Sequence, residues 1–143
     1  MKILFVCTGN MCRSPAAEKL LELYGAGSGF ETRSRGTATQ PYCSMPVRVE
    51  SFLKRTGVID TAHKPALVNE ADIDWADLIL VMENIHAEIL ADKFPQSMRK
   101  TRRFLDHCGP GGDLTDPMGK NDEIFEKVMD RIKDGIKTMI AGV

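Results

Sequence analysis

Hydrophobic positions along the chain alternate between compact runs and helix-like spacing. Short runs of apolar, β-branched or aromatic residues predict strands at 2–6 and 77–82, and further strands are predicted at 30–34 and 101–105. Apolar residues three or four positions apart predict helices over 14–24, 46–56, 85–94 and 121–140. The last of these helices has the longest apolar stripe, formed by Ile124, Val128, Ile132, Ile136 and Met139.

This alternation of strands and helices predicts the fold class. Such a chain builds a parallel sheet with helices on both faces, and its ligand lies at the carboxyl ends of the strands, beside a switch in strand order. We therefore expect one α/β domain over residues 1–143 with a four-stranded parallel sheet. The loop after the first strand, residues 7–13, is the expected ligand site, and the segment 106–120, rich in glycine and proline, is expected to be a loop.

The composition narrows the classes of function. A formal net charge of -1 argues against a nucleic-acid binder, which usually carries a basic excess. The longest apolar runs have five residues, too few for a membrane span, and no signal peptide is visible, so a cytoplasmic protein without membrane contact is expected. The four cysteines are expected to be free thiols, and the three scattered histidines predict no metal site.

The segment between the first strand and the first helix carries the chemistry. Ser14, which a proline follows, favours a helix start with Ser14 as its cap, so the loop from Cys7 to Arg13 ends at a helix N-terminus. Gly9 and Asn10 tolerate the positive φ of a curled loop, whose amides bind anions. Arg13 can hold two phosphate oxygens. The positive potential at this site favours a thiolate on Cys7, placed to attack phosphorus.

The spacing of Cys7 and Arg13 alone is a weak signal, because a buried thiol and a solvated arginine give the same pattern. Their position around a Gly-Asn turn, between an apolar strand and a helix start, favours the catalytic interpretation. Residues 6–15, VCTGNMCRSP, resemble the signature of the low-molecular-weight protein tyrosine phosphatase family, and Ala17-Glu18 continue it. Asp116-Pro117, before the last helix, matches the second motif of that family. The similarity also includes 34–37, 62–63 and 78–82.

The resemblance implies a role for each residue of the site. Cys7 is the nucleophile that forms a phosphocysteine, and Asp116 is the general acid rather than only a turn residue before proline. Neither a metal nor a cofactor takes part. The phosphate is held by a loop that comprises Thr8, Gly9, Asn10, Met11, Cys12, Arg13 and Ser14.

Four neighbours of the nucleophile have supporting roles. Ser14 can cap the helix, donate a hydrogen bond to Cys7, or do both. Asn10 is expected to lock the loop through its side chain. His63 either belongs to this supporting network, as the resemblance implies, or is a surface histidine. Cys12 either forms a protective disulfide with Cys7, as the resemblance implies, or is a small packing residue.

Phosphotyrosine on a phosphorylated protein is the preferred substrate. Met11 is large and apolar, which favours an aryl ring, whereas threonine occupies this position in the branch that resembles bacterial protein-arginine phosphatases. Tyrosine-specific members usually have aromatic walls, but here Met118 follows the Asp-Pro, and Gln40, with Tyr42 nearby, stands in the loop after the second strand. A protein-arginine phosphatase is therefore the main alternative.

Three other classes of protein fit the sequence less well. A thioredoxin-coupled arsenate reductase shares the fold and the loop but needs a resolving pair of cysteines, which residues 82–94 lack. A phosphate-binding module needs neither the cysteine nor the aspartate, and a phosphocarrier needs neither the arginine nor a general acid. We expect a monomer or weak dimer in which Cys43 and Cys108 are bystanders.

Overall fold

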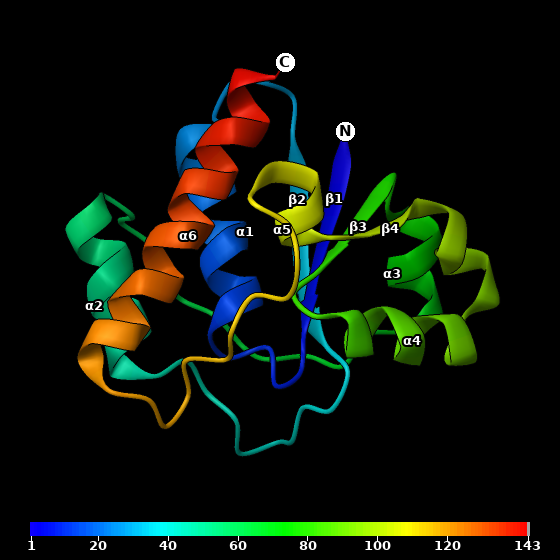
Figure 1. Ribbon diagram of the computed structural model, residues 1–143, viewed down its shortest axis with the longest axis horizontal. Coiled ribbons are helices and arrows are strands. Elements are labelled where there is room, and N and C mark those ends of the chain that lie inside the picture. Colours follow the sequence, from blue (N-terminus) through cyan, green and yellow to red (C-terminus); the bar gives the residue numbers. More distant parts are fainter. Residues whose placement is uncertain (143) are drawn as a thin grey trace.

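Four parallel strands in the order β2-β1-β3-β4 form the centre of the computed structural model, which describes residues 1–142 (Figure 1). The strands are β1 (Lys2–Cys7), β2 (Glu31–Gly36), β3 (Leu78–Val81) and β4 (Thr101–Arg103). Because β2 and β3 lie on opposite sides of β1, the strand order switches direction beside the end of β1. At that end Cys7 is in register with Gly36, and Val6 with Val81. The predicted four-stranded parallel sheet is confirmed.

Helices cover both faces of this sheet, as predicted (Figure 1). The helices are α1 (Arg13–Tyr24), α2 (Val47–Thr56), α3 (Glu70–Trp75), α4 (Asn84–Lys93), α5 (Phe104–Cys108) and α6 (Asp122–Ala141), with a 3-10 helix η1 (Pro95–Lys100). In Figure 1, α1, α2, α5 and α6 lie on one side of the sheet, and α3 and α4 lie on the other.

Alternating residues of β1 supply two separate hydrophobic cores. Ile3 and Phe5 pack with α1, α2, α5 and α6, and the ring of Phe5 meets Phe104 edge-on at 6.3 Å. Leu4 and Val6 point to the other face, where α3 and α4 contribute Ile73 and Leu90. These four side chains of β1 alternate between the two faces of the sheet. All four are fully buried because helices cover both faces.

Several predicted boundaries and one predicted loop are wrong. The predicted strand 101–105 ends at Arg103, and the predicted loop 106–120 starts inside α5. Neither α3 nor η1 was predicted, because each has six residues, too few to show a periodic pattern. The α3 helix is instead specified by a capping box, in which Asn69 accepts from the amide of Asp72 at 2.9 Å.

The apolar stripe of α6 is shifted from its predicted position. Ile124 is 38% exposed, whereas its neighbour Phe125 is buried. Val128, Ile132 and Ile136 are buried as predicted. None of the helices within residues 1–142 is both long enough and apolar enough to cross a membrane.

Candidate active site

The loop between β1 and α1 curls around a single residue with left-handed backbone. Asn10 has a φ of 55°, whereas Gly9, which was also expected to allow positive φ, does not use it. Asn10 is fully buried, and three hydrogen bonds hold it. Its Oδ1 accepts from the amide of Ala66 (2.9 Å), its Nδ2 donates to Ser14 Oγ (2.8 Å), and its carbonyl lies 2.7 Å from His63 Nε2. Of the two interpretations of His63, the supporting one agrees with this contact.

Ser14 lies beside the sulfur of Cys7. The two atoms, Oγ and Sγ, are 2.9 Å apart in a buried contact. Asn10 donates to Ser14 Oγ, and the carbonyl of Arg35 is a more distant acceptor at 3.5 Å, so the serine hydroxyl can donate its own proton to the nearer sulfur, an arrangement that suits a thiolate. The predicted capping role of Ser14 is wrong: α1 begins at Arg13, Cys12 occupies the cap position, and no side chain caps the helix.

Arg13 is almost fully buried, and two acceptors fix its guanidinium. Its Nη1 donates to Glu83 Oε2 (2.6 Å) and to the carbonyl of Leu114 (2.7 Å). Glu83 comes just after β3, so two neighbouring strand ends supply the arginine and its acceptor. Arg13 Nη2 lies 4.0 Å from Asp116 Oδ2. The guanidinium is therefore pinned on one side and faces Asp116 on the other.

A buried histidine connects the loop to α4. His86 Nδ1 accepts from the amide of Glu83 (3.1 Å), so Nε2 carries the proton and donates to Thr8 Oγ1 at 2.8 Å. Burial, with a smaller effect from the charge of Arg13, lowers the pKa of His86 to about 4. The imidazole is therefore neutral at pH 7 and holds both Thr8 and the residue that binds Arg13.

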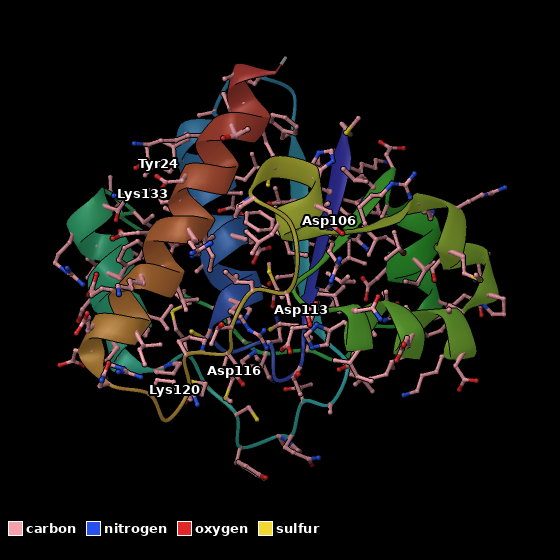
Figure 2. The ribbon with its side chains drawn as sticks, viewed as in Figure 1. Tyr24, Asp106, Asp113, Asp116, Lys120 and Lys133 are labelled. Atoms are coloured by element: carbon pink, nitrogen blue, oxygen red, sulfur yellow. The ribbon has the colours of Figure 1, made fainter. Side chains whose placement is uncertain are left out.

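A pocket of about 320 Å³ opens over this loop. Its lining residues are Cys7, Thr8, Gly9, Met11, Cys12, Arg13, Ala38, Gln40, Tyr42, Cys43, Asp116 and Met118. Asp116 belongs to the segment between α5 and α6, where Figure 2 labels it. Its side chain is half exposed, and its Oδ1 accepts from the amide of Met118 (3.0 Å). A larger groove of about 750 Å³, between α5 and α6, is lined by none of these residues.

The other cysteines differ in their surroundings. Cys12 is buried, and its burial and the neighbouring Cys7 raise its pKa to about 12. Cys108 is buried beside α6, where it lines the larger groove and not the pocket over the loop, and its thiol donates to the carbonyl of Phe104. Cys43 also lines the pocket, and its expected role as a bystander stays a prediction.

Glu83 and His86 are functional neighbours that the sequence pattern did not indicate. Both follow β3, which pairs with β1 at the switch in strand order. The rule that places ligands at this switch could have found them, since it applies to the loops after both strands. The site thus combines a buried thiol, an anion-binding loop at a helix N-terminus, a fixed arginine and a carboxyl group across the pocket.

A family model and two sequence relatives each match most of this chain. The model of the family "Low molecular weight phosphotyrosine protein phosphatase" matches residues 2–143. The protein-arginine-phosphatase of Geobacillus stearothermophilus is 34% identical over 96% of this chain and 97% of its own. The low molecular weight protein-tyrosine-phosphatase PtpB of Staphylococcus aureus is 32% identical over 87% of this chain and 86% of its own.

Solved structures agree with the sequence relatives. The arginine phosphatase YwlE from G. stearothermophilus superposes with a TM-score of 0.90, at 32% identity, over 99% of this chain and 91% of its own. The low molecular weight protein tyrosine phosphatase from T. tengcongensis superposes with a TM-score of 0.91, at 30% identity, over 100% of this chain and 99% of its own.

Proposed function

This chain belongs to the low molecular weight phosphotyrosine protein phosphatase family of hydrolases, and from that membership we propose that it hydrolyses phosphotyrosine in proteins through a phosphocysteine on Cys7. One observation carries the proposal. A buried thiol, 2.9 Å from a serine hydroxyl, lines the same pocket as a fixed arginine and a half-exposed aspartate.

In the first step Cys7 attacks phosphorus. Its thiolate forms the P–S bond while the bond to the tyrosine oxygen breaks, and Asp116 donates a proton to that oxygen. The amides of the loop and Arg13 hold the other phosphate oxygens, where negative charge spreads in the transition state. Glu83 and the carbonyl of Leu114 fix Arg13 for this task in advance.

In the second step water attacks phosphorus. Asp116, now a carboxylate, accepts a proton from the water as the P–S bond breaks, which releases inorganic phosphate and restores the Cys7 thiolate. Ser14 supports both steps by its hydrogen bond to the sulfur, since the thiolate is first the attacking group and then the leaving group. All the positive charge that this scheme requires comes from Arg13, the amides and the helix N-terminus.

The walls of the pocket support an aryl substrate. Met11, Tyr42 and Met118 line it, so a ring entering from solvent meets apolar and aromatic surface. The phosphate site is at the floor, formed by backbone, and a rigid phenyl ring carries phosphate further from the peptide than a seryl methylene does. The depth of the phosphate site below the pocket rim therefore disfavours phosphoserine.

Phosphoarginine is the second candidate substrate. Relatives named protein-arginine-phosphatase, from G. stearothermophilus and Bacillus subtilis, are 34% and 30% identical to this chain. A phosphoarginine side chain is also long enough to reach the floor. Met11 distinguishes the two, because its bulk and apolar surface favour a ring over a hydrated guanidinium.

A turnover assay with matched phosphotyrosine, phosphoserine and phosphoarginine peptides tests the proposal. We expect the highest kcat/KM on phosphotyrosine, a much lower value on phosphoserine, and an intermediate value on phosphoarginine. The substitution Met11→Thr should shift the ratio of kcat/KM values toward phosphoarginine. A wild-type preference for phosphoarginine would exclude the tyrosine specificity and leave the cysteine mechanism intact.

Redox protection and location complete the proposal. Cys12 lines the same pocket as Cys7, which supports a Cys7–Cys12 disulfide as the protected form after oxidation. The four cysteines are free in the structure, and catalysis needs a reduced Cys7. Both points support work in the reducing cytoplasm. The monomer or weak dimer stays a prediction.

A further inference from the structure

The general-acid loop, residues 115–120, is exposed except for Pro117 and lies between two fixed points. Before it, the amide of Leu114 donates to the carbonyl of Met82, which directly follows β3 (2.8 Å). After it, Asn121 caps α6. Within the loop the amide of Lys120 donates to the carbonyl of Pro117 (3.1 Å), which closes a tight turn.

Arg48, on α2, donates hydrogen bonds to both ends of this turn. Its Nη2 donates to the carbonyl of Pro117 (3.3 Å), and its Nη1 donates to the carbonyl of Lys120 (3.0 Å). Nη1 also lies 3.2 Å from Asp122 Oδ1, in the first turn of α6. The guanidinium stacks 4.4 Å above the ring of Phe125, which is buried. A flat fork of donors held on an aromatic face suits arginine and not lysine.

The turn that Arg48 binds also positions the side chain of Asp116, the proposed general acid. Asp116 directly precedes Pro117, and its Oδ1 accepts from the amide of Met118, inside the turn. Movement of the turn therefore moves the carboxyl group. A proton donor must lie within hydrogen-bond reach of the leaving oxygen, and a misplacement of about 1 Å can cost about a hundredfold in rate.

We propose that Arg48 is a positioning residue for proton donation: it holds the turn 117–120 so that Asp116 faces the leaving oxygen. The inference rests on the proposed role of Asp116. Arg48 acts through the backbone of the loop and does not touch the substrate. It should therefore affect the step that needs the proton and leave phosphate binding by the loop after β1 unchanged.

The substitution Arg48→Met tests this inference, because methionine keeps an apolar stem over Phe125 but has no donors. The measurement is kcat/KM for phenyl phosphate and for p-nitrophenyl phosphate. Phenolate is the poorer leaving group and needs the proton, whereas nitrophenolate leaves without it. We expect a loss of about tenfold or more on phenyl phosphate and less than about twofold on p-nitrophenyl phosphate. The ratio of the two values does not depend on how much of the variant is folded.

Arg55→Met is the matched control. Arg55 lies two turns further along α2 and bonds to Glu126 of α6 at 2.7 Å, so it joins the same two helices. Its removal should leave the ratio of kcat/KM values for the two substrates at the wild-type value. A change of that ratio equal to the one in Arg48→Met would show that any loosening of α2 on α6 is sufficient, and would overturn the specific role.

Asp116→Asn separates this inference from the proposed function. If Asp116→Asn alone leaves the ratio unchanged, the acid assignment fails and the inference fails with it. If Asp116→Asn changes the ratio but Arg48→Met does not, only the positioning role is wrong. Adding Arg48→Met to Asp116→Asn should lower kcat/KM on phenyl phosphate by less than about twofold, because the double variant has no proton donor left to position. A full additional loss there would also overturn the role.

Discussion

Replacing Gly36 by alanine adds one methyl group, which should displace the phosphate-binding loop. Gly36 ends β2 in register with Cys7, and both of its backbone polar groups are bonded, to Ala66 and Val68. A Cβ at this position would lie 2.5 Å from the carbonyl oxygen of Thr8, whereas ordinary contact begins at 3.4 Å. The same Cβ would lie 3.1 Å from the backbone nitrogen of Asn10.

The magnitude follows from these distances. The nearest atoms belong to backbone, so the loop itself must withdraw, by roughly 0.9 Å, to restore ordinary contact. Overpacking of this kind costs about 1–3 kcal/mol in the free energy of unfolding. A displacement near 1 Å in a catalytic loop can cost about a hundredfold in rate. We therefore expect Gly36→Ala to lose between about tenfold and a hundredfold in kcat/KM on p-nitrophenyl phosphate, and to bind inorganic phosphate more weakly.

Gly135→Ala provides the matched control in α6. Its added Cβ would lie 2.6 Å from Phe104 Cζ and 3.1 Å from Cys108 Sγ, so the steric conflict is comparable but lies in the core, not at the phosphate loop. Urea unfolding and kinetics are measured on both variants. Gly135→Ala should lose stability while kcat/KM stays within about twofold of wild type, since the loop does not move. Wild-type kcat/KM in Gly36→Ala would refute the reasoning, because the loop would then tolerate displacement.

Three further predictions concern single side chains. Cys7→Ser should lower turnover of p-nitrophenyl phosphate below about a hundredth of wild type, while phosphate binding by calorimetry survives; higher turnover would exclude Cys7 as the nucleophile. Peroxide should inactivate the wild type reversibly and Cys12→Ser irreversibly, because in the variant the Cys7 sulfenic acid has no neighbouring thiol. The intact mass of the wild type should show the loss of two hydrogens. Equal recovery of both proteins by dithiothreitol would contradict the protective role of Cys12. The pKa of about 4 for His86 lies below that of an unfolded histidine, so the unfolded chain binds the proton first and stability should fall as pH drops from about 6.5 to 4. Urea titrations should give a flatter profile for His86→Gln, and identical profiles would mean that other groups dominate.

Local signals in the sequence were sufficient for the sheet and for the loop after β1. β1 and β3 are continuous apolar runs, whereas β2 and β4 are short polar segments whose places follow from the alternation of strands and helices. The loop is a contiguous segment in which strand end, Gly-Asn turn and helix start follow one another. Boundaries were less predictable where hydrogen bonding and not hydrophobicity decides them. Ser14 is an example: it has the side chain of a helix cap, but Asn10 and Cys7 use its hydroxyl, and the helix begins one residue earlier.

Partners that are distant in sequence could not be read from local patterns. Glu83 and His86 have no distinctive spacing to Arg13 or Thr8, and only the pairing of β3 with β1 brings them there. Arg48 is equally inconspicuous, because an arginine on an amphipathic helix is normally a solvated residue. Its contacts depend on how α2 packs against the start of α6, which the helix pattern alone does not specify.

The partners of the phosphate-binding loop have a consequence for the order of folding. They are 53 residues away for Asn10 and His63, and 101 residues away for Arg13 and Leu114. Contacts of such sequence separation form late, since long loops must close first. During synthesis Arg13 emerges 101 residues before its acceptor Leu114, so the proposed site stays incomplete until that later segment has been made and docked.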